Sequence, residues 1–179
     1  MAISIVLSCF AASDQLANAS YPKPRPPVPP PESESGKASA KVKVIKRMPV
    51  RLTAYYGPLR NQEKYVYGSY KKDVRVNGSG KITRSGKIPA VGMAAADWRV
   101  LPRGTKLRIP QCDVPLGTDF PKPASEIIFE VEDTGGAVKN RHIDIFAGFG
   151  DKGRKLAEKI NDLQPKKFVI EVVEVCPSQ

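Results

Sequence analysis

Two aspartates on either side of a paired-glycine turn are the residues best placed to do chemistry. Asp133 follows the apolar run Ile127–Val131, and Asp144 stands between Ile143 and Ile145. An apolar run of this kind is typical of a buried strand, and alternation is typical of a strand with one face in a core. Asp133 is therefore expected at the end of one strand, and Asp144 within a strand after the turn. Paired carboxyl groups in this setting suit general acid–base chemistry.

The surroundings of Asp144 favour a carboxyl group that keeps its proton at neutral pH. A free aspartate has a pKa of about 3.9, so a general acid needs a raised value. The flanking isoleucines and Phe146 disfavour the charged form, and a nearby Asp133 carboxylate does the same. In the turn between the aspartates, Gly135 and Gly136 are expected to adopt positive φ and to leave their amides open to a ligand.

The lone histidine and the three cysteines restrict other chemistry. His142 would have to serve in any Ser–His or Cys–His pair, and a plain strand residue beside Asp144 is the alternative. No His and Cys spacing matches a metal site, so neither a metal nor a cofactor is expected. If Cys9 is removed during export, Cys112 and Cys176 remain. An even pair predicts a disulfide in an oxidising compartment, with two buried thiols as the alternative.

The chain from Asp133 to Gly148 resembles the three-aspartate (3D) double-psi β-barrel domain of stationary-phase survival proteins and of the membrane-bound lytic transglycosylase A family. Asn140 stands where this family usually has glycine, and asparagine also adopts the left-handed conformation. The third aspartate of the pattern matches Asp97, which precedes a Pro-Arg-Gly-Thr turn. The first-strand motif matches Thr53-Ala54-Tyr55-Tyr56. The positions that match the turn and second strand are Asp133, Gly135, Gly136, Ala137, Val138, Lys139, Asp144 and Gly148.

The resemblance implies a mainly β fold, a six-stranded double-psi β-barrel with one or two short helices. It also implies a peptidoglycan lytic transglycosylase, which cleaves the β-1,4 bond between N-acetylmuramic acid and N-acetylglucosamine and leaves a 1,6-anhydro ring. Asp144 then acts as the single acid/base, while Asp133 and Asp97 set the field around it. Expected substrate-binding residues are Thr53, Tyr55, Tyr56, Thr83, Ser85, Thr134, Gly135, Gly136 and Lys139.

Two other functions stay open. Double-psi barrels of the expansin type bind or loosen polysaccharide without cutting it, and in those the aspartate set is incomplete. A structural barrel in a basic nucleic-acid-binding protein is the third reading. It has little support, because no zinc spacing, Arg-rich helix or aromatic RNA-binding motif accompanies the positive charge. For any single aspartate, a turn cap or a strand-end hydrogen bond is the plain structural alternative.

Hydrophobic patterning predicts the remaining elements. A helix is expected over Asp151–Leu163, with Leu156, Ile160 and Leu163 on one face and Asp151 as its cap. Propensity alone makes Val91–Asp97 a helix, whereas the resemblance makes it a strand. Further strands are expected over Lys46–Tyr56, Gly80–Pro89 (a strand and turn), Thr105–Pro110 and Phe168–Val175.

Two longer connections are expected between these elements. Gly57–Ser79 reads as a long loop or hairpin at the barrel mouth. Its tyrosines, Tyr65, Tyr67 and Tyr70, suit sugar rings or pack the loop onto its own barrel. Cys112–Ser125 is an excursion rich in Pro and Gly that lengthens the gap between Asp97 and Asp133.

The net charge suggests a protein that binds polyanions, and the N-terminal sequence suggests export. The chain has 179 residues and a formal net charge of +11. Such a balance favours nucleic acid, acidic lipid or cell-wall polymer, or simply keeps the protein soluble. An apolar run before an Ala-Asn-Ala site predicts a signal peptide over 1–19. A Pro-rich linker is expected over 20–46, and the 3D-type double-psi β-barrel domain that the resemblance implies over 47–179. The expected partner is the peptidoglycan glycan strand, met by a monomer in the periplasm or cell envelope.

Overall fold

The computed structural model describes residues 42–117, 121–164 and 166–175. The predicted signal peptide and most of the predicted linker therefore lie outside the described residues. Within them, no helix is long and apolar enough to cross a membrane. The elements are β1 (Val42–Gly57), α1 (Tyr70–Asn77), β2 (Met93–Ala96), β3 (Lys106–Arg108), β4 (Pro115–Leu116), β5 (Lys122–Pro123), the 3-10 turn η1 (Ala124–Glu126), β6 (Phe129–Asp133), β7 (His142–Phe149), α2 (Gly150–Asn161) and β8 (Lys167–Val175).

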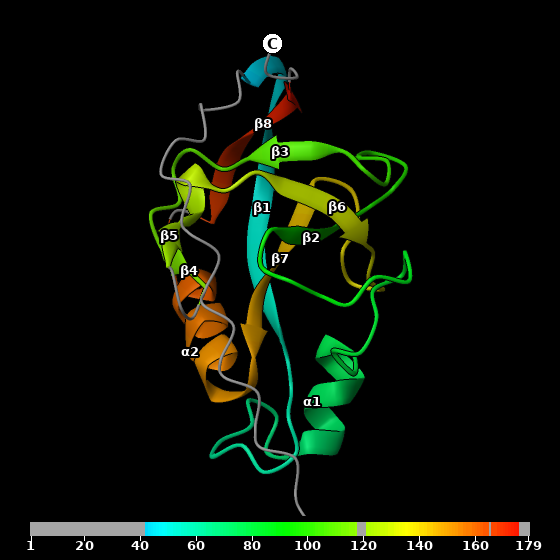
Figure 1. Cartoon of the computed structure of the whole chain (residues 1–179), viewed down its shortest axis with the longest axis vertical. Helices are drawn as coiled ribbons and strands as arrows, with labels where there is room; N and C mark the ends of the chain where they lie inside the picture. Colours follow the sequence, from blue (N-terminus) through cyan, green and yellow to red (C-terminus); the bar gives the residue numbers. More distant parts are fainter. Residues whose placement is uncertain (1–41, 118–120, 165, 176–179) are drawn as a thin grey trace, which may run out of the picture. The chain divides into compact units, whose positions relative to one another are not determined.

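Six strands pair in a closed barrel of order β1-β7-β2-β6-β3-β8, in which β8 returns to β1. The β1–β7 and β2–β6 pairs are parallel and the other four are antiparallel. Figure 1 shows β1 as the long strand on which the others are arranged. The expectation of a mainly β fold with a six-stranded sheet and one or two short helices is confirmed. The double-psi connectivity stays a prediction.

Every second residue of the barrel strands fills the core. On β1, Met48, Val50, Leu52 and Ala54 are buried, and the residues between them are more exposed. Fully burying an apolar side chain contributes about 1.5–3 kcal/mol. Because side chains alternate across a strand, the residues between core positions lie on the outer face of the barrel wall. There Tyr55, Ala95, Val138 and Phe146 form a second, smaller buried cluster.

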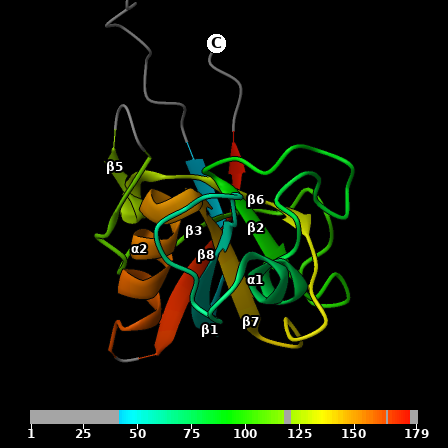
Figure 2. The same ribbon diagram turned by 90° about the horizontal axis from the view of Figure 1, so that it is seen from below.

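Helix α2 packs on the barrel beside the C-terminal half of β1, and α1 lies on the other side of that strand (Figures 1 and 2). The contact of α2 with β7 requires glycine. A Cβ added at Gly153 would lie 2.4 Å from the carbonyl carbon and oxygen of Gly148. The expected helical face is correct at Ile160, which is buried, whereas Leu156 and Leu163 are partly buried against the core.

The prediction that Asp151 caps α2 is wrong. Phe149 is the N-cap residue and makes no side-chain capping bond. Asp151 instead accepts hydrogen bonds from the backbone N–H groups of Glu63 (2.6 Å) and Lys64 (3.2 Å). Its carboxylate therefore fastens the loop after β1 to the start of the helix.

Several element boundaries differ from expectation. Strand β1 begins at Val42, inside the expected linker, and pairs with β8 from that residue. The predicted strand within Gly80–Pro89 is absent, and this segment forms turns. The long loop expected over Gly57–Ser79 contains α1, and the Pro/Gly-rich excursion contains β4 and β5. Val91–Asp97 does supply a strand, β2, so the resemblance outperforms helix propensity there.

Candidate active site

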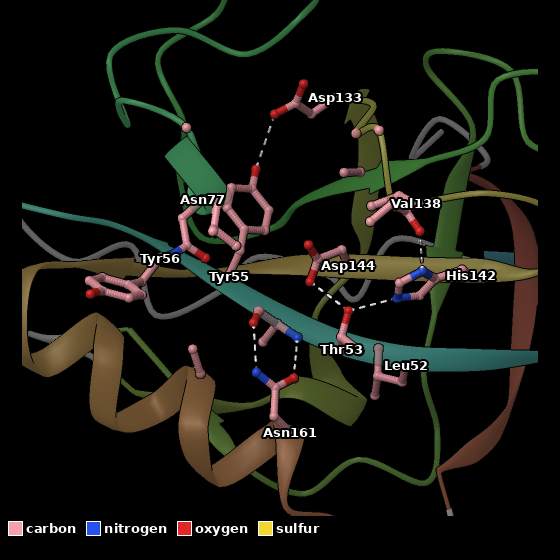
Figure 3. A pocket seen from close by; sticks show the side chains of 18 of the residues that line it. Leu52, Thr53, Tyr55, Tyr56, Asn77, Asp133, Val138, His142, Asp144 and Asn161 are labelled. Atoms are coloured by element: carbon pink, nitrogen blue, oxygen red, sulfur yellow. Dashed lines mark hydrogen bonds between the residues drawn. The ribbon is translucent and has the colours of Figure 1, made fainter. Parts of the chain in front are cut away.

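A cleft of about 830 Å³ opens on the outer face of β1 and β7 (Figure 3). Strand β1 forms its floor, the turn between β6 and β7 forms one wall, and α2 forms another. The end of α1 and the loop before it, with Val66, Tyr67 and Val76, complete the rim. Asp133 and Asp144 both line this cleft.

Strand register brings Asp144 next to Thr53. These residues are paired across the parallel β1–β7 ladder, and Ala95 of β2 is the partner on the other side. The Thr53 hydroxyl lies 2.7 Å from Asp144 Oδ1 and 2.8 Å from His142 Nε2. Alternation then explains the rest of the arrangement. His142, like Asp144, lies on the outer face of β7, because Ile143 between them faces the core.

Burial raises the pKa of Asp144 above its ordinary value. The carboxyl group is partly buried, and removal from water disfavours its charged form. The negative charge of Asp133 raises the pKa further, whereas the Thr53 hydrogen bond and the positive charges of His142 and Arg51 lower it. Burial outweighs these opposing contacts. Asp144 therefore has the property that a general acid needs.

Asp133 is held at the end of β6 by backbone amides. Its Oδ1 accepts hydrogen bonds from the N–H groups of Arg84 and Thr134, both at 2.8 Å. The Tyr55 hydroxyl donates to Oδ2 at 3.4 Å, and burial raises the pKa of that phenol well above its usual range. Tyr55 is thus a neutral donor between the two carboxyl groups. Figure 3 shows its ring directed toward Asp133.

The third aspartate lies apart from the cleft. Asp97 is buried, but it does not line the cavity. Its carboxylate binds the Arg99 guanidinium at 2.9 and 2.7 Å and accepts a 3.0 Å hydrogen bond from the backbone N–H of Asn140. The Arg99 contact holds the pKa of Asp97 well below its usual range. In this position Asp97 fastens the turn between β6 and β7.

The expectation that the two turn glycines adopt positive φ is wrong, whereas their role in substrate binding stays a prediction. Neither Gly135 nor Gly136 adopts positive φ, and the left-handed residue of this turn is Asn140, with φ of 57°. A Cβ at Gly135 would approach Val138 Cγ2 at 3.0 Å, whereas one at Gly136 would meet nothing within 4 Å. The turn is therefore held by the left-handed backbone of Asn140 and its hydrogen bond to Asp97. The two glycines add no side chains to this wall of the cleft.

An amide from α2 aligns the floor of the cleft. Asn161 accepts a 2.8 Å hydrogen bond from the backbone N–H of Ala54 and donates a 3.0 Å bond to its carbonyl oxygen. The β1–β8 ladder ends at Arg51, so the side chain of Asn161 replaces a strand partner for the next part of β1. It thereby fixes Thr53 and Tyr55, whose side chains flank Ala54 on the outer face.

Buried Asp73 ties the rim of the cleft to the barrel. It accepts hydrogen bonds from the Tyr56 hydroxyl and from the N–H groups of Val66 (3.0 Å) and Tyr67 (2.7 Å). Burial, together with this carboxylate, raises the pKa of Tyr56 to about 12. Tyr67 is 46% exposed and faces the cleft, so its ring is open to a ligand. Tyr65 and Tyr70 instead pack edge to face on each other.

The structure places most of the predicted site residues together. Those that line the cleft are Thr53, Tyr55, Tyr56, Thr83, Asp133, Thr134, Gly135, Gly136 and Asp144. Three do not line it: Asp97, exposed Lys139, and Ser85, whose hydroxyl lies 2.9 Å from that of Thr83. Cys112 is buried, and its predicted partner Cys176 lies outside the described residues, so the disulfide stays a prediction.

Sequence reasoning missed the contribution of α2. Arg154, Glu158 and Asn161 line the cleft, and the Arg154 guanidinium binds the Glu158 carboxylate at 2.8 and 2.7 Å. Their spacing of three and four residues was the available signal, since it places them on one helical face beside buried Ala157. Among the described residues, no group of three or more His, Cys, Asp and Glu side chains could hold a metal ion.

Part of the chain matches a known protein family. Residues 93–162 match the family model described as the 3D domain, a range that contains Asp97, Asp133 and Asp144. No curated protein matches the sequence.

Among solved structures, the chain is similar to E. coli MltA with bound chitohexaose, at 23% identity over 54% of this chain and 28% of that one, with a TM-score of 0.39. A second structure of E. coli MltA gives 21% identity, the same coverage and a TM-score of 0.39. The lytic transglycosylase LtgG of Burkholderia pseudomallei gives 20% identity over 56% of this chain and 28% of that one, with a TM-score of 0.35. The chain thus spans about 28% of the length of each of these structures.

Proposed function

We propose that this chain, which contains a 3D domain over residues 93–162, is a peptidoglycan lytic transglycosylase. The observation that carries the proposal is Asp144, a carboxyl group in the floor of a long cleft whose pKa is raised by burial. Its proton is retained at a pH where an exposed aspartate would have lost it. A cleft of about 830 Å³ is also large enough to hold part of a glycan chain.

A single carboxyl group is sufficient for this reaction. The Asp144 carboxyl group donates its proton to the glycosidic oxygen as the bond between that oxygen and the anomeric carbon breaks. The 6-hydroxyl oxygen of the same N-acetylmuramic acid then bonds to the anomeric carbon, and its proton passes to the Asp144 carboxylate. The 1,6-anhydro ring forms and Asp144 ends in its starting state, so no water is consumed.

The neighbouring residues support that cycle. The Asp133 charge helps to keep Asp144 protonated, and the Thr53 hydroxyl stabilises the carboxylate that forms after the first proton transfer. Tyr67 offers an apolar ring face that suits a sugar ring. We assign Asp97 to holding the turn, rather than to tuning Asp144, because Arg99 already neutralises its charge.

The test is the chemical form of the product. Purified peptidoglycan incubated with the protein in ¹⁸O-labelled water should yield muropeptides that end in 1,6-anhydro-N-acetylmuramic acid and carry no ¹⁸O at the new end. Mass spectrometry distinguishes them from reducing ends that contain ¹⁸O, which would identify a hydrolase instead. Binding to peptidoglycan with neither product would favour the non-catalytic, expansin-like function.

The proposal also requires export, since its substrate lies outside the cytoplasm. The predicted signal peptide over 1–19 and the Pro-rich segment after it fit a domain that must reach the wall. N-terminal sequencing of the native protein should therefore begin near Ser20. A native cytosolic form that retains Met1 would contradict this part of the proposal.

A further inference from the structure

We propose that His142 and Asp144 share one proton through the hydroxyl group of Thr53, and that His142 is thereby a positioning residue for the acid/base. This inference rests on the proposed function for its catalytic meaning. Its physical content, the sharing of a proton, stands on the hydrogen bonds of the cleft and is testable without any substrate.

The hydrogen bonds of the His142 imidazole restrict which of its ring nitrogens can carry a proton. His142 Nδ1 lies 3.1 Å from the carbonyl oxygen of Ala137, which accepts but never donates. Nδ1 must therefore carry a proton to make that bond. The other ring nitrogen, Nε2, lies 2.8 Å from the Thr53 hydroxyl, and that same hydroxyl lies 2.7 Å from Asp144 Oδ1. Thr53 has one proton, so it can donate to only one of these two neighbours.

Two states satisfy every partner in this chain. In the first, Asp144 is a carboxylate, Thr53 donates to it, and Nε2 of a charged imidazole donates to Thr53. In the second, Asp144 is a neutral acid that donates to Thr53, and Thr53 donates to Nε2 of a neutral imidazole. The states interconvert when one proton moves from Nε2 to the Thr53 oxygen and another moves from that oxygen to Asp144. Nδ1 keeps its proton in both.

The two states are the two forms that the reaction needs. The neutral acid is the form that donates to the leaving oxygen. The carboxylate is the form that takes the 6-hydroxyl proton, and Thr53 stabilises it by turning its hydroxyl group. Among the described residues, Thr53 supplies the only hydrogen bond to the Asp144 side chain. Its orientation is therefore coupled to the charge on Asp144, and the imidazole is the group on its other side.

Other charged residues line the cleft that holds the pair, among them Arg84, Asp162 and Lys166. Arg51 precedes Thr53 on the same face of β1 and is paired with His142 in the ladder, and Asp133 faces Asp144 from the end of β6. Tyr55 contributes a neutral phenol, β2 presents alanines, and on α2 the Arg154 and Glu158 charges are paired with each other. A change at His142 is therefore expected to act on Asp144 mainly through Thr53 and through its own charge.

The test uses the fact that His142 is the only histidine of the chain. With ¹⁵N-labelled histidine, NMR reports the protons on both ring nitrogens from one residue without further assignment. In the wild-type protein, Nε2 should be the nitrogen that loses its proton as the pH rises, while Nδ1 keeps its own. In Asp144→Asn, that loss should occur at lower pH, because the carboxylate that favours the charged ring is gone.

Thr53 variants show whether the hydroxyl carries the coupling. In Thr53→Val, addition of Asp144→Asn should shift the Nε2 transition much less, whereas Thr53→Ser keeps the hydroxyl and should behave as the wild type. Loss of the Nδ1 proton first, or an unchanged transition in folded Asp144→Asn, would overturn the inference. Because NMR needs no substrate, these outcomes are independent of whether anhydro-muropeptides form.

If the protein releases anhydro-muropeptides, the coupling can also be tested through the pH dependence of that activity. In His142→Gln the ring charge is absent, so Asp144 should keep its proton to higher pH and activity should persist further into the alkaline range. In His142→Arg the charge is permanent, so activity should be lost at lower pH than in the wild type. If the pH at which activity is lost moved in the same direction in both variants, or did not move in either, the result would count against the coupling.

Discussion

At the scale of single residues, the cleft separates the roles of three aspartates that look alike in the sequence. Asp144 is a half-buried carboxyl group with one hydroxyl partner, Asp133 accepts from two amides, and Asp97 binds an arginine. The environment of Asp144 raises its pKa, whereas that of Asp97 lowers its pKa. This difference comes from tertiary contacts, because Arg84, Asn140 and Thr53 are distant in sequence from the aspartates they contact.

Asp133→Asn should move the pH range of activity without abolishing activity. The amide keeps an oxygen for the N–H groups of Arg84 and Thr134 but removes a negative charge that raises the pKa of Asp144. The pKa of Asp144 falls, so its acid form is lost at lower pH. The alkaline limb of the rate profile for release of anhydro-muropeptides should therefore shift to lower pH.

The matched control is Asp97→Asn, which changes a carboxylate whose charge is already offset by Arg99. It should leave the position of the alkaline limb in place, even where the turn is loosened and the rate falls. A larger shift of the limb in Asp97→Asn than in Asp133→Asn would reverse the roles assigned to these two residues.

At the scale of elements, the site depends on how α2 is seated against β1. Asn161 supplies both hydrogen bonds that β8 no longer provides to Ala54. Asn161→Ala leaves a backbone donor and a backbone acceptor unpaired at a buried position. Each costs about 1–3 kcal/mol, so the free energy of unfolding should fall by roughly 2–6 kcal/mol. Urea denaturation measures this loss.

Asn161→Asp serves as the control, since it retains the acceptor for the Ala54 N–H but not the donor for its carbonyl oxygen. Its stability should lie below that of the wild type because one of the two bonds is gone. A loss under about 0.5 kcal/mol for Asn161→Ala, the range of ordinary surface changes, would show that β1 does not depend on this amide.

Gly153→Ala tests the contact between α2 and β7. In an open helix, alanine would stabilise by up to about 1 kcal/mol. Here the added Cβ would lie 2.4 Å from backbone atoms of Gly148, so the helix must move away. Overpacking of this kind costs about 1–3 kcal/mol, and the melting temperature should fall.

Gly136→Ala is the matching control for stability, because its Cβ would meet nothing within 4 Å and its φ is not positive. Its melting temperature should stay close to that of the wild type. If Gly153→Ala were at least as stable as the wild type, the close approach of α2 to Gly148 would not be limiting.

At the scale of the whole molecule, local pattern predicted the barrel strands other than β2, but not the walls of the cleft. Alternation around Asp144 placed it on a strand, and β8 was visible from the alternation of Phe168, Ile170 and Val172. Helix α1 was missed because its sequence is polar and partly β-branched. It is fastened through buried Asp73, whose partners Tyr56, Val66 and Tyr67 lie in other segments.

The sequence also predicted only part of the candidate site. Motif order identified Asp133 and Asp144, because each follows or lies within a strand that local pattern predicts. Asp97 lies outside the cleft, where its carboxylate accepts a hydrogen bond from the distant backbone N–H of Asn140, and Asn161 enters the cleft through its contact with Ala54. Neither contact has a signature in the order of residues alone.

The most direct test of the account is the rate at which Asp144→Asn releases anhydro-muropeptides from purified peptidoglycan. The amide keeps the shape of the side chain and its bond from Thr53 but cannot carry a proton. Loss of a general acid lowers the rate by roughly 100- to 10,000-fold, so we expect a loss of this size with peptidoglycan binding and folding retained. A folded Asp144→Asn protein that releases these products at the wild-type rate would contradict the central claim.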